Sequence, residues 1–409
     1  MHWLAVLVLI LQNFFPLLSS SPAQDNGSAG ATVVDTGSTT EFGKKIVFAA
    51  QAQPAADVSE MLVSFTPEGQ ITHLEQMNLG AAGNAIYEIP VVQLPLAPFT
   101  QITYSFEARW KDGTKASSQK YTLAYNDNRY VWQYLEEGIF QVHWNAEDAT
   151  LGQDLINVAS AGLEEAQRIL PINPPAPLRI YAYSSARALQ EALLMTNDIW
   201  VAGHASPDLG LILISVPTGP EKKLELQRQI PHEIMHLLQY QIVGKNLSRQ
   251  PVWLMEGMSS LVELYPNPEY GRVLEETAKN DELIPMENLC DAFPNDAGPA
   301  FKAYAQSESF VRFLHTTYGT TGLRSLMDQS QNGLGCNEAV SAAFGTTLGQ
   351  LEYRWKQEVL GINAGELAVR RLSPYLWLAL LLLVPAVFSF WPMRKSKESV
   401  PENPAQEKL

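Results

Sequence analysis

Cysteine, histidine and basic residues are scarce in this sequence. Its 409 residues include 2 cysteines and 7 histidines, and 28 lysines and arginines stand against 43 acidic residues, a formal net charge of −15. The body of the chain has no basic run, which argues against nucleic acid as a partner. The two cysteines, Cys290 and Cys336, do not have the CxxC spacing of a metal or redox pair. The length allows two domains, or one large domain with appendages.

Long uncharged stretches occur at both ends of the chain. No charged side chain precedes Asp25, and small residues follow the apolar stretch 3–11, so residues 1–23 are expected to be a secretory signal peptide. Lysine and arginine are absent near the start, which leaves an uncleaved anchor as the alternative. Residues 372–393 carry no charge and are long enough to span about 30 Å of hydrocarbon as a transmembrane helix. A buried helix in a soluble core is the alternative there.

These ends predict a single-pass protein of the cell membrane. The signal peptide directs the body of the chain to the extracytoplasmic side, and residues 394–409 become a cytoplasmic tail. In an exported protein, Cys290 and Cys336 are expected to form one disulfide. Two unpaired buried thiols are also compatible with the sequence.

Composition and periodicity divide the body of the chain. Residues 24–40 are rich in Ser, Gly, Ala and Thr, which predicts a flexible linker. Over 41–127 apolar and polar residues alternate, as from Ile102 to Trp110, and KDGT at 111–114 is a hairpin turn. This pattern predicts a small immunoglobulin-like β-sandwich that serves as a spacer or docking module. From 128 to 361 helical spacing dominates, with strands expected at 178–185 and 209–217.

The motif HEIMH, at 232–236, brings candidate catalytic residues together. A helix turns about 100° per residue, so His232 and His236 project from one face, one turn apart, while Ile230 and Ile234 lie roughly opposite. We expect this helix to begin after residue 220 and to end at residue 244, with a kink at Pro231. The alternative is two surface histidines beside a solvated glutamate.

A candidate third ligand occurs in the segment WLMEGMSSLVE, at 253–263. On a helix Leu254 and Met258 form an apolar face, and Glu256, Ser260 and Glu263 lie opposite it. Catalytic zinc usually has three protein ligands and a water. Two helices packed by their apolar sides can aim both histidines and the first of these glutamates at one point. A solvated acidic face is the alternative.

The two motifs together resemble a known family. HExxH followed about twenty residues later by WLxEG is similar to the gluzincin zinc metallopeptidases, and the pattern is closest to the peptidase MA-like domain family over residues 128–361. The resemblance implies an α+β, zincin-like metallopeptidase domain that binds Zn²⁺ through His232, His236 and Glu256. It also implies that Glu233 is the general base that takes a proton from a zinc-activated water.

The resemblance implies further roles around the metal. The segment AYAQSESFVRFL, at 303–314, resembles the helix on which aminopeptidases of this clan carry a tyrosine facing the zinc, and Tyr304 has the matching position as donor to the oxyanion. A packed tyrosine is the alternative, and His315 is a weaker candidate for that role. Ser260 and Glu263 are expected to support the ligands. The exopeptidase motif GxMEN is missing upstream of the zinc helix, and PMEN at 285–288 lies downstream and is taken as coincidence, so an endopeptidase is expected.

These expectations combine into a membrane-anchored, extracytoplasmic zinc metallopeptidase that hydrolyses peptides or proteins. The alternative is a cell-surface binding or adhesion protein on a catalytically degenerate zincin scaffold, but the intact His-Glu-His-Glu set favours the enzyme. The strand before the zinc helix is expected to form the edge of its sheet. An extended substrate would then pair beside residues 211–215.

Overall fold

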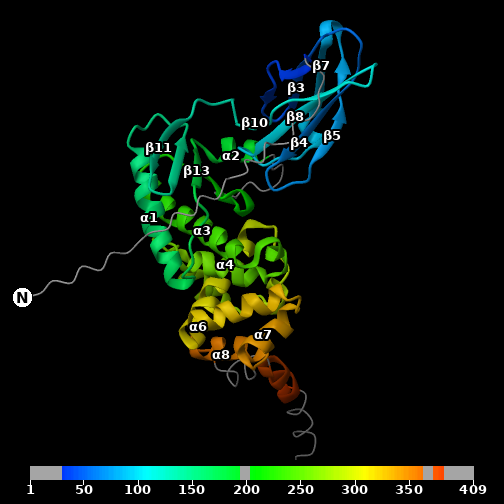
Figure 1. Ribbon diagram of the computed structural model, residues 1–409. Helices are drawn as coiled ribbons and strands as arrows, with labels where there is room; N and C mark the ends of the chain where they lie inside the picture. Colours follow the sequence, from blue (N-terminus) through cyan, green and yellow to red (C-terminus); the bar gives the residue numbers. More distant parts are fainter. Residues whose placement is uncertain (1–29, 194–202, 363–371, 382–409) are drawn as a thin grey trace, which may run out of the picture. The chain divides into compact units, whose positions relative to one another are not determined.

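The computed structural model describes residues 30–193, 203–362 and 372–381 (Figure 1). The chain divides mainly between Val131 and Trp132 into two compact units. The expected signal peptide at 1–23 and the expected cytoplasmic tail at 394–409 lie outside the described residues.

The first unit is a β-sandwich-like region of two antiparallel sheets. One sheet has the order β1-β3-β7-β6 with β2 paired to β3, and the other has the order β10-β8-β4-β5 with β9 paired to β8. Burial alternates along the long strands, and Phe48 packs between Phe65 and Tyr104 at ring-centroid distances of 5.0 and 5.1 Å. The strands are β1 (Thr32–Asp35), β2 (Thr39–Glu41), β3 (Lys45–Gln53), β4 (Val58–Pro67), β5 (His73–Gln76), β6 (Asn78–Leu79), β7 (Asn84–Pro90), β8 (Gln101–Trp110), β9 (Lys115–Ser117) and β10 (Tyr121–Ala124).

The expected flexible linker at 24–40 is wrong in its second half. Strand β1 pairs with β3 over four residues, and β2 begins at Thr39, so the sandwich starts before residue 41. The β-branched run Thr32, Val33 and Val34 favours a strand, and Val33 is buried. Composition averaged over the whole segment concealed this short strand.

The second unit contains a mixed five-stranded sheet with the order β11-β12-β13-β15-β14. Strands β12, β13 and β15 are parallel, and β11 and β14 run antiparallel to their neighbours. The strands are β11 (Gln133–Glu137), β12 (Phe140–Trp144), β13 (Leu178–Tyr183), β14 (Gly203–Ser206) and β15 (Leu211–Ser215).

The expectation that residues 211–215 form the edge of the sheet is wrong. Strand β14 pairs with β15 from Gly203 opposite Ile214 to Ser206 opposite Leu211, so among the described residues β14 is the last strand of the sheet. All five residues of β15 are buried. A strand that is apolar on both faces is typical of the interior of a parallel sheet rather than its edge.

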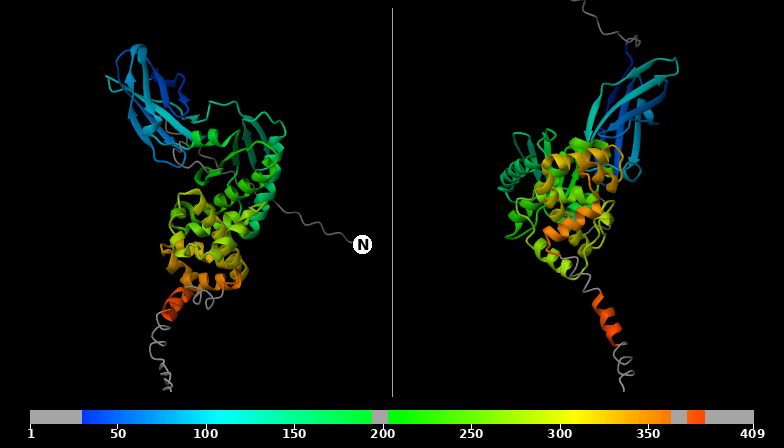
Figure 2. Two further views of the ribbon diagram at one scale, coloured as in Figure 1. Left: turned by 180° about the vertical axis from the view of Figure 1, so that it is seen from behind. Right: turned by 90° about the horizontal axis from the view of Figure 1, so that it is seen from below.

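Helices α1 and α3 cover one face of this sheet, and the later helices lie on the far side of α3 (Figure 1; Figure 2, left). A continuous cluster of buried apolar side chains runs from the sheet through α3 and α4 to α6 and α8. The helices are α1 (Leu151–Ile169), α2 (Ala186–Ala192), α3 (Lys222–Val243), α4 (Val252–Leu261), α5 (Glu269–Lys279), α6 (Ala297–Gln331), α7 (Cys336–Phe344) and α8 (Leu348–Glu358).

Helix α3 continues as one element through Pro231. The proline is buried against α1, where a Cβ atom added at Gly162 would lie 2.8 Å from Pro231 Cγ. Glycine at this position therefore lets the two helices approach closely. The packing against α1 holds the helix just before the two histidines.

A second glycine allows close contact between α4 and α6. A Cβ atom at Gly257 would lie 2.5 Å from both Ser307 O and Val311 Cγ2. Next to this contact, Trp253 and Phe310 pack edge to face with ring centroids 5.1 Å apart, and both side chains are fully buried. The contact fixes the depth of α4, and therefore of Glu256, in the core.

The expected disulfide between Cys290 and Cys336 is formed. Cys290 follows the short 3-10 helix η5 (Met286–Leu289), and Cys336 begins α7. The backbone N–H of Val252 donates to the Cys290 carbonyl at 2.8 Å, so the segment closed by the disulfide also contacts the start of α4.

Residues 372–381 form a helix. Its exposed large apolar side chains are Leu372, Tyr375, Leu376, Trp377, Leu378, Leu380 and Leu381. Within the described part of the chain, no helix combines the length and the apolar character needed to cross a membrane. Residues 382–393 of the expected span lie outside the described residues.

The Gly257 contact gives a test of the packing between α4 and α6. Gly257→Ala should destabilise the protein by about 1–3 kcal/mol, because the added methyl group meets backbone that has little room to move. Gly271→Ala is the matched control: Gly271 lies in α5 with open space around its Cα, so alanine should stabilise by about 0.5–1 kcal/mol. Urea unfolding of both variants measures the difference, and equal effects would contradict the close contact.

Candidate metal centre

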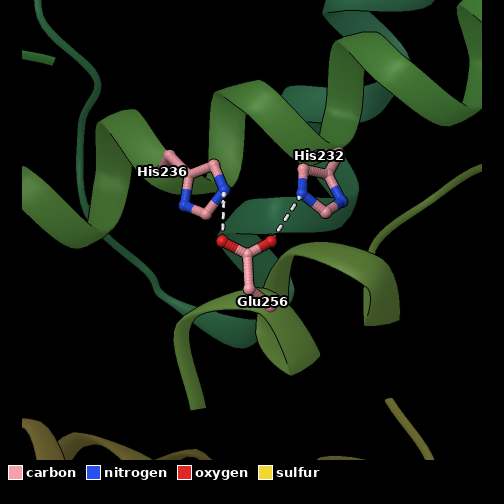
Figure 3. A group of neighbouring side chains, drawn as sticks. All are labelled: His232, His236 and Glu256. Atoms are coloured by element: carbon pink, nitrogen blue, oxygen red, sulfur yellow. Dashed lines mark hydrogen bonds and ion pairs between the residues drawn. The ribbon is translucent and has the colours of Figure 1, made fainter. Parts of the chain in front are cut away.

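Two histidines and one glutamate converge between α3 and α4 (Figure 3). His232 and His236 project from α3 with ring centroids 5.1 Å apart, and Glu256 reaches toward them from α4. The Nε2 atom of His232 lies 3.2 Å from Glu256 Oε2, and the Nε2 atom of His236 lies 3.7 Å from Glu256 Oε1. One ligand atom from each residue lies within 4.8 Å of the other two.

This donor set fits a zinc ion. With ligand atoms about 2.0–2.1 Å from zinc, neighbouring ligands in a tetrahedral site are separated by about 3.3 Å. The distance from His232 Nε2 to Glu256 Oε2, 3.2 Å, is close to that separation, and His236 Nε2 lies 3.7 Å from the other oxygen, Oε1. Two imidazoles and one carboxylate are also a ligand set of catalytic zinc sites, which keep a fourth position for water or substrate.

Both imidazole rings are oriented from behind by hydrogen-bond acceptors. Glu263 Oε1 lies 3.3 Å from His232 Nδ1, and Gln239 Oε1 lies 2.9 Å from His236 Nδ1. Gln239 Nε2 in turn donates to the Met255 carbonyl at 2.9 Å, which fixes the amide with its oxygen toward the ring. Each Nδ1 therefore donates to its acceptor, and each Nε2 faces the carboxylate of Glu256, where it would coordinate a metal ion once it has no proton.

The residues around the ligands match the sequence analysis only in part. Glu263 contacts a histidine, as expected, whereas the buried Ser260 hydroxyl makes no hydrogen bond to any of the three candidate ligands. The sequence analysis missed Gln239 and Ser259, whose Oγ lies 3.3 Å from His236 Nδ1. Gln239 follows His236 by three residues on one helix, a spacing that places them on one face.

The carboxylates and imidazoles of this cluster shift one another's pKa. Burial alone raises the pKa of Glu256, but the nearby His236 and His232 outweigh it and lower that pKa overall. Burial alone lowers the pKa of His232, but hydrogen bonds to Glu256 and Glu263 outweigh it and raise that pKa to about 10. Without a metal the carboxylates thus retain a proton on the histidine. A divalent cation supplies the same positive charge, so its binding releases the proton.

Glu233 lies beside the edge strand of the sheet. Its side chain is buried, and a Cβ atom added at Gly203 of β14 would lie 2.6 Å from Glu233 Oε1. A side chain at position 203 would therefore displace the carboxylate or the strand. The sequence analysis missed Gly203, because a four-residue strand of the sequence GHAS has no apolar alternation.

Tyr304 comes from α6 and faces the cluster. Its ring centroid lies 6.3 Å from that of His232, and its ring packs edge to face on Phe293 at 5.0 Å. Burial, and then the charges of Glu256 and Glu233, raise the pKa of Tyr304 above its ordinary value. The phenol therefore stays protonated and keeps a hydrogen to donate.

Two other sequence candidates lie away from the cluster. His315 Nε2 lies 3.4 Å from Thr320 Oγ1, further along α6, and His315 does not join the three ligands. In PMEN, at 285–288, Met286 is buried in the core and Glu287 accepts a hydrogen bond from Asn337 Nδ2 at 2.8 Å. The PMEN segment belongs to η5 and supplies no residue of the cluster.

Sequence comparison identifies the domain that carries this cluster. Residues 158–361 match the family described as the peptidase MA superfamily. This part of the chain belongs to the peptidase MA superfamily. The match includes the whole of α3, α4 and α6, so the resemblance to a gluzincin-like peptidase domain is confirmed. No curated protein sequence matches the chain.

Solved structures give only distant similarities. An aminopeptidase N family protein from Idiomarina loihiensis is 9% identical over 83% of this chain and 75% of that chain, with a TM-score of 0.33. A carbohydrate-binding module of family 56, a β-1,3-glucan binding domain, is 15% identical over 22% of this chain and 95% of that chain, with a TM-score of 0.17. At these TM-scores neither similarity says anything about the function of the peptidase MA domain.

The orientation of His236 by Gln239 can be tested by metal binding. Gln239→Leu should weaken zinc binding about 10–100-fold, because the ring loses its principal acceptor. Gln250→Leu is the matched control: Gln250 is also buried and also donates to a backbone carbonyl, that of Met327 at 3.1 Å, but does not contact the cluster. Competition with a chelator of known affinity measures both variants. Equal zinc affinities would show that Gln239 does not support the ligand.

Proposed function

We propose that the chain is a zinc-dependent metallopeptidase with a zincin-type catalytic domain, preceded by an immunoglobulin-like sandwich. The observation that carries this proposal is the convergence of His232, His236 and Glu256 on one point with Glu233 beside them, inside a peptidase MA domain. All four residues are intact. That favours an enzyme over a binding protein on a degenerate scaffold.

Each side chain around the cluster has a separate role in the proposed hydrolysis. A bound zinc ion supplies positive charge that acidifies water and polarises a carbonyl group. Glu233 accepts the proton of the attacking water and passes it to the amine that leaves. The Tyr304 hydroxyl donates a hydrogen bond to the carbonyl oxygen as it becomes negative. Glu263 and Gln239 keep the histidine rings in place throughout.

Substrate is proposed to bind as an extended strand beside β14. This strand ends the sheet as far as the chain is described, so its outer edge offers backbone N–H and C=O groups to a peptide. Gly203 has no side chain to keep a peptide backbone away from Glu233. The strand sequence GHAS has no carboxylate to hold a free amino terminus. Cleavage of internal bonds is therefore proposed.

We also propose that the chain is anchored in a membrane with both units on the extracytoplasmic side. The uncharged stretch at 372–393 supports this proposal, and the apolar side chains of its described part are exposed. The disulfide between Cys290 and Cys336 is of the kind that persists in oxidising compartments.

The mechanism is tested with Glu233→Gln and one peptide offered with a free or an acetylated amino terminus. The wild type should cleave both peptides at similar rates. The variant should bind zinc stoichiometrically, because no ligand is changed, and should lose at least about 100-fold in kcat, because the base is gone. Metal analysis and chromatography of the products measure both. Retained activity would refute the role of Glu233, and strict dependence on the free amine would make the enzyme an aminopeptidase.

The orientation in the membrane is tested on intact cells that express the chain with a tag after Leu409. Protease added outside should digest both units and leave the tag protected. Immunoblotting for the tag measures the outcome. A tag destroyed from outside would reverse the orientation, and a full-length chain recovered in the soluble fraction would refute the anchor.

A further inference from the structure

A cavity of about 330 Å³ opens beside the metal cluster. His232, Glu233, Tyr304 and Gly203 form the side of the cavity that faces the chemistry. The remaining wall comes from α3, α5, α6 and the segment after α4. The volume is at the lower end of ligand pockets, so the cavity suits one side chain of a substrate better than a large ligand.

The walls of the cavity are apolar and partly aromatic. Tyr270 of α5 and Phe301 of α6 line it and pack edge to face with ring centroids 5.1 Å apart. Ala297 and Ala300 in the first turn of α6 also line it, and their small side chains leave the space open. Flat aromatic side chains gain most from such walls.

On the polar side of the cavity, one buried acceptor atom and one buried donor atom make no hydrogen bond within the described chain. The Glu263 side chain is 3% exposed, and while Oε1 contacts His232, Oε2 has no hydrogen-bond partner within the described chain. Arg228 Nε also has no hydrogen bond there, and it forms an ion pair with Glu263 Oε2 at 3.8 Å, which is beyond hydrogen-bond distance. Arg228 Nη1 is already bound to Glu225 Oε1 at 2.7 Å.

We infer that this cavity is a side-chain subsite of the proposed peptidase that selects tyrosine next to the scissile bond. The ring fills the space between Phe301, Tyr270 and the two alanines. The hydroxyl donates to Glu263 Oε2 and accepts from Arg228 Nε, since a phenol can do both at once.

Other side chains satisfy the cavity less well. Phenylalanine fills it but leaves a donor and an acceptor buried and unmet, which costs free energy. A lysine ammonium could pair with Glu263 but would lie beside the Arg228 guanidinium, which bears the same charge. An acidic side chain would be repelled by the carboxylate of Glu263. The charge of Arg228 would not offset this fully, because Arg228 is already paired with Glu225. Only a neutral group that both donates and accepts suits both atoms.

The test compares acetylated peptides that carry Tyr, Phe, Leu, Lys or Glu at one position, placed in turn on either side of the cleaved bond. At one of the two positions kcat/KM for Tyr should exceed that for Phe at least about tenfold, or about 1.4 kcal/mol. Lys and Glu should be poorer than Phe. Equal rates for Tyr and Phe, or a preference for Lys, would overturn the inference.

Two variants connect the preference to this cavity. Ala297→Phe adds a ring at an exposed position on the cavity wall and should lower kcat/KM for the Tyr peptide at least tenfold more than for an Ala peptide. Gly298→Phe is the control, because Gly298 is exposed, has open space and does not line this cavity. Gly298→Phe should leave kcat/KM unchanged for both the Tyr peptide and the Ala peptide. Arg228→Met should reduce the Tyr-to-Phe ratio to about one, whereas a purely structural role would lower both rates equally.

The inference rests on the proposed function, and a binding measurement separates the two. Fluorescence anisotropy of labelled Tyr and Phe peptides on zinc-loaded Glu233→Gln protein reports the subsite without hydrolysis. A Tyr preference in binding, with no cleavage by the wild type, supports the subsite and refutes the peptidase. Cleavage without any Tyr preference supports the peptidase and refutes the subsite. Absence of both binding and cleavage refutes both.

Discussion

The carboxylate of Glu256 is largely shielded from water, with 21% of its side chain exposed, and its charge is compensated by the groups beside it. His232 and His236 supply that compensation through their Nε2 atoms at 3.2 and 3.7 Å. An imidazole does so only if its ring is held in one orientation, and Glu263 and Gln239 hold the two rings. A cation that binds three such groups replaces a proton and gains the attraction of a carboxylate that is already partly desolvated.

This cluster requires α3 and α4 at a fixed separation, and glycines allow both helices to pack closely on α1 and α6. Gly162 lets α1 reach Pro231, one residue before the first histidine. Gly257 lets α4 reach the backbone of α6, one residue after the glutamate. Gln239 then joins α3 to α4 through the Met255 carbonyl, directly before Glu256. His232 and Glu256 are therefore next in sequence to contacts that leave the backbone little freedom, and the geometry of the site follows from core packing.

The features that could be predicted from the sequence are those that depend on the spacing of residues close together along the chain. The helix at Lys222–Val243 and the pairing of its histidines follow from local periodicity. Glu256 could be predicted as a ligand because its helix shows the same division into an apolar and a polar face. The edge strand could not be predicted, because its sequence GHAS is short and does not alternate between apolar and polar residues. The fully apolar sequence LILIS of β15 was wrongly predicted to be the edge instead. The strand Thr32–Asp35 was hidden in a composition typical of linkers.

Gly203 and the cavity together limit how a substrate can lie. Gly203, Glu233 and the polar pair Arg228 and Glu263 all border the same cavity. A peptide paired along β14 would pass over Gly203, and side chains alternate between the two faces of an extended strand. Alternate residues of that peptide therefore face the cavity or turn away from it. Because Glu263 both orients His232 and borders the cavity, one carboxylate connects the orientation of a metal ligand to the recognition of a side chain.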